Sequence, residues 1–154
     1  MKLKLKDLEI SSPAFLSLGA IPQKYTSEGE NISPPLQWRK VPSDTKQFAL
    51  ICHDPDAPLP EGFTHWTLYN IPPETTEIAE GGGASFTQGI NTTADQGYTG
   101  PAPPPGHGPH HYFFWLYALD GVLDLEPGLN RTDLLDAIAP HVIAQARLVG
   151  IYER

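Results

Sequence analysis

Apolar and polar residues alternate along much of the chain, and this pattern predicts short β-strands. Successive side chains of a strand point to opposite faces, so alternation marks a strand with one buried face. A stretch that is apolar throughout marks a strand covered on both faces. The expected strands are an opening strand with Leu3, Leu5 and Leu8 inward, then Leu36 to Val41, Gln47 to Cys52, Thr64 to Ile71, Tyr112 to Leu119 and Arg147 to Tyr152. The strand from Tyr112 is apolar on both faces, which predicts a central place in a sheet.

The strand from Thr64 to Ile71 has a histidine within its alternating pattern. Strict alternation divides its side chains into two faces. These are His65, Thr67 and Tyr69 on one face, with Trp66 and Leu68 on the other. The sequence therefore predicts that His65 and Trp66 lie on opposite faces.

Glycine and proline mark two long segments, from Gly19 to Pro35 and between the fourth and fifth expected strands. Both are expected to be loops, and a loop as long as the second is usually functional or disordered. One helix is expected near the end of the chain. It begins at Asp133 with Thr132 as its N-cap, and Pro140 is expected to kink or break it, because the proline ring clashes with the preceding turn.

These elements predict a mainly β fold. Several strands, long turns and a late helix indicate an antiparallel β-sandwich, Greek-key-like, with one or two short helices near the C-terminus. The 154 residues suit a single domain, 1–154, and no internal repeat is found. The 17 prolines and 14 glycines agree with this class, because proline lacks an N–H donor and interrupts helices.

The chain is acidic, with 18 acidic and 10 basic residues and a net charge of −8. Such a charge repels nucleic acid phosphates and anionic membrane surfaces at long range, so neither is an expected partner. Histidines next to a ligand act at short range, whereas the net charge acts over a Debye length of about 8 Å at physiological salt. A site for an anion is therefore expected to be local and enclosed.

The cysteine content and the N-terminus bear on the compartment. The single cysteine, Cys52, excludes an intramolecular disulfide and suits a reducing compartment. The first residues alternate lysine with leucine and contain no apolar stretch of signal-peptide length. No segment approaches the roughly 20 apolar residues that span a bilayer. A cytoplasmic protein without membrane insertion is the expectation.

Titratable residues gather at three places near strand ends, which are His53-Asp54-Pro55-Asp56, His65 and His107-Gly108-Pro109-His110-His111. Strand ends meet at the rim of a sandwich, where loops form pockets. His65 and His110, oriented by Asp54 or Asp56, would make a small pocket able to donate hydrogen bonds to phosphate oxygens. Each residue also has an ordinary structural explanation, a half-buried strand histidine or an aspartate in a turn. Taken one by one, these residues therefore do not establish a binding site.

Other chemistries are less favoured by the sequence. The spacing of His107, His110 and His111 matches neither a helical His-x-x-x-His pair nor a paired-cysteine framework, so no metal is expected. No Gly-x-Ser-x-Gly nucleophile motif is present, and Cys52 stands in an apolar stretch. The glycine-rich motifs that bind nucleotide phosphates are absent, and no cofactor is expected.

Three motifs in one order are more specific than any single residue. They are Asp54-Pro55-Asp56-Ala57-Pro58, His65-Trp66 and the segment from Tyr98 to Tyr112. Together they resemble the phosphatidylethanolamine-binding protein family, also called the Raf kinase inhibitor-like family, and are most similar to its short prokaryotic branch. The resemblance extends from about Phe15 to Tyr152.

The resemblance implies an antiparallel β-fold with a small pocket at one end that binds phosphate, acetate or anions like a phospholipid headgroup. The residues that it places at the pocket are Asp54, Asp56, His65, Pro103, Pro104, His110 and Tyr112. His53, His107 and His111 are not required there. Ala102 stands where many relatives carry glycine and Phe63 where some carry tryptophan, so the pocket mouth is expected to differ. The C-terminal extension of eukaryotic members is missing after Arg154, so their kinase regulation is not implied.

The expected function is therefore non-enzymatic binding of a small anionic or phosphorylated ligand. One form of this hypothesis is a kinase-inhibitor-like modulator that binds such a ligand. One alternative is a hydrolase of a small ester or phosphoester, with His65 or His110 and an aspartate as general acid and base. Another is a protein-inhibitor module in which the pocket is secondary. A protein partner and a homodimer are left open by the sequence.

Overall fold

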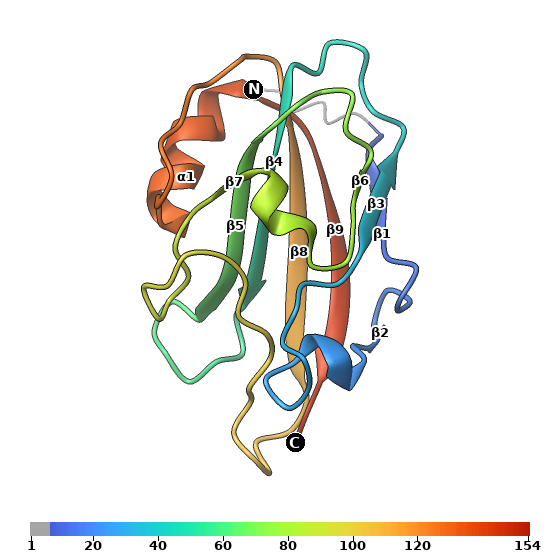
Figure 1. Ribbon diagram of the computed structural model, residues 1–154, viewed down its shortest axis with the longest axis vertical. Coiled ribbons are helices and arrows are strands. Elements are labelled where there is room, and N and C mark those ends of the chain that lie inside the picture. The colour runs from blue at the N-terminus through green and yellow to red at the C-terminus, as the bar shows by residue number, and fades with distance from the viewer. Residues whose placement is uncertain (1–6) are drawn as a thin grey trace.

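Two β-sheets pack face to face in the computed structural model, which describes residues 7–154 (Figure 1). The smaller sheet has the order β1-β3-β6, with β1 (Glu9–Ser11), β3 (Leu36–Arg39) and β6 (Glu77–Ile78). The larger has the order β2-β9-β8-β4-β5-β7, with β2 (Gly19–Ala20), β4 (Gln47–Asp54), β5 (Phe63–Ile71), β7 (Thr87–Gln88), β8 (His110–Leu119) and β9 (Val142–Tyr152). All neighbouring strands are antiparallel except β2 and β9. The predicted fold class is confirmed.

The main core lies between the two sheets, and a second core lies between the larger sheet and its helix. Trp38 of β3 packs on Phe48 of β4, with ring centroids 5.4 Å apart. On the opposite face of β4, Ile51 belongs to the cluster under the helix. Because β4 is covered on both faces, all of its residues are buried. This strand carries Asp54 at its end.

The helix α1 (Arg131–Ile138) begins earlier than predicted and has a different cap. Its N-cap is Asn130, whose side chain accepts the N–H of Asp133 at 2.8 Å, so the prediction of Thr132 as the cap is wrong. Asparagine satisfies the orphan N–H groups at a helix start at least as well as threonine does. The predicted break at Pro140 is confirmed by the 3-10 helix η3 (Ala139–His141). Within residues 7–154, no helix has the length and apolar character needed to cross a membrane.

Several predicted boundaries differ from those in the structure. Leu3 and Leu5 lie outside the described residues, and Leu8 is buried directly before β1. Strand β9 begins at Val142, five residues before the predicted start at Arg147, because the whole length of β8 is available for pairing. The predicted loops contain β2, β6, β7 and the 3-10 helices η1 (Gln23–Tyr25) and η2 (Gly82–Ser85). Elements this short leave no periodic signal in a sequence.

A β-bulge in β5 changes the face on which His65 lies. Cys52 of β4 pairs with Trp66, but the next residue, His53, pairs with Thr64. His65 is therefore the extra residue of the bulge, and bulges redirect the side chains around them. Its ring lies on the same side of the sheet as Trp66, next to the core between the sheets. The predicted separation of His65 from Trp66 is thus wrong.

Candidate functional site

A cavity of about 410 Å³ lies at one end of the larger sheet. The loop between β4 and β5 and the loop before β8 approach each other at this end, where the C-terminus also lies (Figure 1). The strands contribute Asp54, Phe63, His65, His110 and Tyr112, and the loops contribute Ala57, Pro58, Leu59, Thr93, Thr99, Gly100, Ala102, Pro103 and Pro104. We call this space the Asp54–His110 cavity. All of the residues predicted at the pocket line it except Asp56.

Asp54 and His110 form a buried pair on the neighbouring strands β4 and β8. His110 Nδ1 lies 2.6 Å from Asp54 Oδ2, and the side chains are 2 % and 3 % exposed. Because the carboxylate accepts, His110 Nδ1 donates. The second carboxylate oxygen accepts the backbone N–H of Asp56 at 2.7 Å. On the other side of the His110 ring, Nε2 lies 2.6 Å from Nδ1 of His107, so a single proton is shared between the two rings.

The tautomer of His65 is determined by a backbone group. His65 Nδ1 lies 2.7 Å from the carbonyl oxygen of Thr99. A carbonyl can only accept, so Nδ1 carries the proton and Nε2 of a neutral ring presents a lone pair. Burial lowers the pKa of His65 from 6.5 to about 4, and the charges of His53 and His110 act in the same direction. The imidazole is therefore neutral near pH 7.

Tyr112 is 1 % exposed and lines the cavity, and its hydroxyl has no hydrogen-bond partner among the described residues. In that part of the chain, only Thr45 has a side-chain polar atom that is both sealed from solvent and unpaired. The hydroxyl of Tyr112 and Nε2 of His65 are unpaired but not sealed, so both reach open space in the cavity. Burial raises the pKa of Tyr112, as does the negative charge of Asp54, so the hydroxyl keeps its proton and can donate it in a hydrogen bond.

The C-terminal residue holds the proline-rich wall of the cavity. Arg154 Nε donates to the carbonyl of Pro103 at 2.6 Å, and the carbonyl of Arg154 accepts the N–H of Gly106 at 2.9 Å. Ala102 and Phe63, the two positions at which the resemblance predicts a different pocket mouth, both line the cavity. The guanidinium of Arg154 is thus engaged by backbone carbonyls of the wall.

Asp56 faces away from the cavity although it lies two residues from Asp54. Its Oδ2 accepts both the backbone N–H and the ring Nδ1 of His111, each at 2.7 Å. Burial raises the pKa of Asp56, but the hydrogen bonds from His111 outweigh this effect and lower the pKa below its usual value. The structure therefore does not bring Asp56 together with the other predicted residues.

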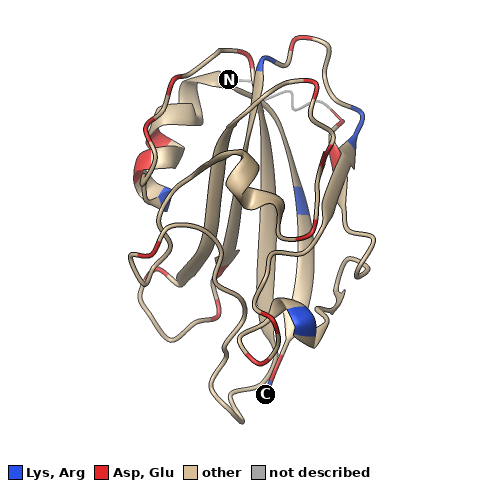
Figure 2. Cartoon of the chain, in the orientation of Figure 1, with Lys and Arg blue, Asp and Glu red and all other residues tan. Residues whose placement is uncertain are grey.

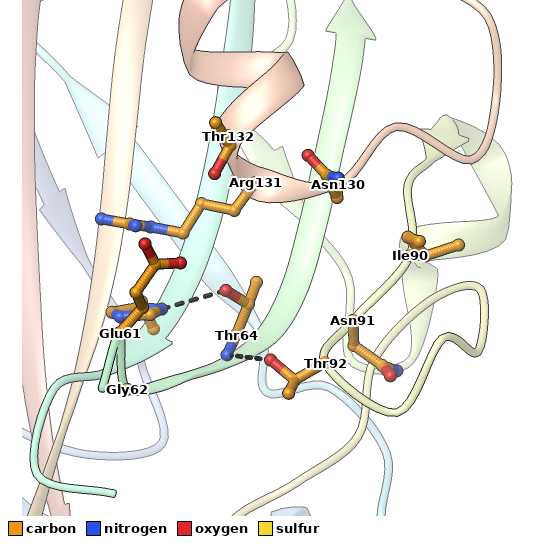
Figure 3. Close-up of a pocket in the computed structure, with 10 residues that line it drawn as sticks. Glu61, Gly62, Thr64, Ile90, Asn91, Thr92, Asn130, Arg131 and Thr132 are labelled. Atoms are coloured by element: carbon orange, nitrogen blue, oxygen red, sulfur yellow. Dashed lines mark hydrogen bonds between the residues drawn. The ribbon is translucent and has the colours of Figure 1, made fainter. Parts of the chain in front are cut away.

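His53 lies on the helix side of the larger sheet, where it lines a second cavity of about 220 Å³ (Figure 3). Its Nδ1 lies 3.0 Å from Oγ1 of Thr64. Figure 3 shows the side chains of Glu61 and Arg131 reaching toward each other at this cavity. Burial and the charge of Arg131 lower the pKa of His53 to about 4. The consecutive residues His53 and Asp54 thus face different cavities on the two sides of one sheet.

Few charges face the Asp54–His110 cavity. Among the described residues that line it, none is Lys or Arg. Figure 2 shows the Lys and Arg positions spread over separate parts of the molecule. Within residues 7–154, no three or more His, Cys, Asp or Glu side chains are grouped so that they could hold a metal ion. The cavity is therefore electrostatically defined by the Asp54–His110 pair itself.

Comparison with known proteins identifies the family of this chain. The model of the family described as phosphatidylethanolamine-binding protein matches residues 11–153. The chain belongs to this family. The UPF0098 protein of Methanothermobacter thermautotrophicus is 48 % identical to it over 153 residues, which cover 96 % of this chain and 99 % of the relative. The resemblance to the prokaryotic branch of the phosphatidylethanolamine-binding protein family is confirmed.

Two crystal structures of family members have the same fold. A phosphatidylethanolamine-binding protein homologue from Chlamydia trachomatis is 40 % identical, with a TM-score of 0.91 and coverage of 97 % of this chain and 99 % of its own. Escherichia coli YbcL, described as a new member of the mammalian family, is 30 % identical, with a TM-score of 0.89 and coverage of 96 % and 98 %. The whole described fold is thus the family fold.

Sequence reasoning missed two contributors to the cavity, Thr99 and Leu59. Thr99 acts through its backbone carbonyl, and Leu59 offers only apolar surface. Thr99 belongs to the motif segment from Tyr98 to Tyr112, which was the available signal. Their side-chain chemistry alone gave no reason to select them.

Proposed function

We propose that this chain binds a small phosphorylated molecule or another small anion in the Asp54–His110 cavity and does not convert it. The observation that carries the proposal is a pair of polar atoms, Nε2 of His65 and the hydroxyl oxygen of Tyr112, which have no partner among the described residues and face open space in the cavity. A hydrogen bond to each atom contributes about 0.5–1.5 kcal/mol, or about 1.5–3 kcal/mol where the ligand group is charged. Family membership supports the same class of ligand, because the family is described by its binding of a phospholipid.

The walls of the cavity support a small-molecule site. Leu59, Phe63 and Pro103 provide apolar surface around a few convergent polar groups. Known ligand sites combine these two features, with the polar groups fixing the orientation of the ligand. The cavity also lies at strand ends, where loops can shape it without disturbing the core.

Calorimetric titration with phosphoethanolamine and inorganic phosphate tests the proposal. His110→Ala removes the donor to Asp54 and leaves Oδ2 of the buried carboxylate without its partner, so affinity should fall by about tenfold or more. His111→Ala is the matched control, because the neighbouring ring is turned toward Asp56 and should leave affinity unchanged. Wild-type affinity in His110→Ala, with the fold intact by circular dichroism, would contradict the proposal.

Hydrolysis is a second candidate, and it is favoured by the Asp54–His110 pair. A histidine oriented by a buried carboxylate is an arrangement that general bases use. A screen of phosphate and carboxylate esters tests it. Turnover that disappears in Asp54→Asn would replace binding with catalysis as the function, whereas ligand binding without turnover would favour the first proposal.

A modulator role would follow from ligand binding if the ligand is part of a protein partner. Such a partner should be captured by the wild-type chain and lost in His110→Ala. Capture that is unaffected by this substitution would indicate an inhibitor module in which the cavity is secondary.

A further inference from the structure

The hydrogen-bonding character of the Asp54–His110 cavity limits which anions it can accept. Nε2 of His65 presents a lone pair, because its Nδ1 proton is committed to the carbonyl of Thr99. Asp54 adds a carboxylate to the same cavity. An oxyanion without a proton would place its own lone pairs against both groups, and neither side could donate.

We infer that the cavity selects oxyanions that carry a proton of their own, such as a hydrogen phosphate or the monoanion of a phosphomonoester, with His65 as the residue that determines this specificity. The inference rests on the proposed function and specifies its ligand as free phosphate or a phosphomonoester and not a phosphodiester such as an intact phospholipid. In the bound state the O–H group of the ligand donates to His65 Nε2. The hydroxyl of Tyr112 donates to another oxygen of the same ligand.

Three observations support this assignment. No Lys or Arg of the described residues lines the cavity, and the guanidinium of Arg154, whose charge reaches Tyr112, donates to the carbonyls of Pro103 and Ala102 and not into the cavity. Burial keeps the pKa of His65 at about 4, so its Nε2 remains an acceptor throughout the neutral range. His110 cannot replace it as a donor, because its Nδ1 faces Asp54 and its Nε2 faces His107. The donor that completes the His65 hydrogen bond must therefore come from the ligand.

Phosphate and sulfate are a matched pair of probes, because they share size and shape but only phosphate keeps an O–H group near pH 7. Calorimetric titration of the wild-type chain should show phosphate binding at least about 30-fold tighter than sulfate, a difference of about 2 kcal/mol, because sulfate would oppose acceptor to acceptor. Sulfate binding within about threefold of phosphate would overturn the inference and leave the proposed function standing. If neither anion binds, the proposed function fails as well.

Methyl phosphate provides an independent test, because its second proton leaves near pH 6, as in other phosphomonoesters. Its affinity should fall about tenfold for each pH unit above that value, since only the protonated form fits. Inorganic phosphate retains one O–H group over the same range and serves as the internal control, with a much smaller decrease. Equal pH profiles for the two probes would contradict the inference.

Two substitutions assign the selectivity to His65. His65→Gln places an amide N–H donor near the position of Nε2, so sulfate affinity should rise and the preference for phosphate should shrink to about threefold or less. His65→Asn can keep the hydrogen bond to Thr99 but lacks any group at Nε2, so it should lose selectivity without gaining sulfate affinity. His141→Gln, in η3, is the control and should keep the wild-type preference. Unchanged selectivity in both folded His65 variants would exclude this residue as the determinant.

Discussion

His110 and His111 are adjacent on β8, yet their rings meet different carboxylates. His110 pairs with buried Asp54, whereas His111 pairs with Asp56, whose side chain is 40 % exposed. Strand alternation sends the two rings to opposite faces of the sheet, and each ring meets a different aspartate there. At the scale of single residues, the hydrogen-bond partner therefore decides which histidine belongs to the cavity.

A substitution at Asp56 tests whether both aspartates of the Asp54-Pro55-Asp56 motif contribute to ligand binding. In Asp56→Asn the backbone N–H that supports Asp54 is retained, and the altered side chain lies outside the cavity. We expect phosphate affinity to remain within about twofold of wild type in calorimetry. A loss of about tenfold would mean that Asp56 contacts the ligand, as the family resemblance implies.

His65 makes stability dependent on pH in a defined direction. Its pKa is 6.5 without the fold and about 4 within it. Between these values the unfolded chain binds a proton that the folded chain does not, so the free energy of unfolding falls as the pH decreases through this window. The loss attributable to His65 is about 3 kcal/mol once the pH is below about 4.

Denaturant titrations at a series of pH values measure this dependence. His53 has a similarly lowered pKa and contributes in the same direction, so the wild-type slope contains both residues. In His65→Asn the slope should decrease because the contribution of His65 is removed. An identical slope in the two proteins would show that His65 is not kept neutral by the fold.

At the scale of elements, the turn between β4 and β5 positions the site. Gly62 in this turn has a φ of 70°, which favours glycine, and a Cβ there would lie 2.4 Å from the carbonyl oxygen of Asp54. The close approach of the two backbone segments holds the end of β4, where Asp54 projects. A side chain at this position would therefore displace the backbone of Asp54, from which the carboxylate projects.

Gly62→Ala should lower the free energy of unfolding by more than about 2 kcal/mol, and it should weaken phosphate binding as well. Gly81→Ala is the matched control: φ is 66° there, but a Cβ would meet nothing within 4 Å. The control carries only the conformational cost, about 1 kcal/mol, with binding unchanged. Thermal unfolding and calorimetry on both variants measure the two effects. Equal effects would rule out the steric contact as the cause.

At the scale of the whole molecule, the net charge of −8 opposes the binding of any anion. No Lys or Arg among the described residues of the cavity lining offsets this repulsion locally. Salt screens the repulsion while leaving the short hydrogen bonds in the cavity nearly unaffected. The long-range charge therefore opposes anion binding, whereas the hydrogen bonds of the local site favour it.

Phosphate affinity should consequently rise with ionic strength. Between about 10 mM and about 150 mM sodium chloride, we expect an increase of about threefold in calorimetric titrations at constant pH. Most sites that bind anions through basic side chains show the opposite trend. A decrease in affinity with salt would indicate that a cation contributes to binding.

The sequence by itself determined the mainly β class, the approximate course of five strands, the break at Pro140 and, through three motifs, the family. These features depend on local periodicity, on proline geometry and on residues that occur in a fixed order. Only the tertiary structure decided the tautomer of His65, the inward turn of Asp54 and the outward turn of Asp56. His65 and Thr99 are 34 residues apart, and Asp54 and His110 are 56 apart. Hydrogen bonds over such separations depend on a bulge and on strand register, which no local pattern encodes.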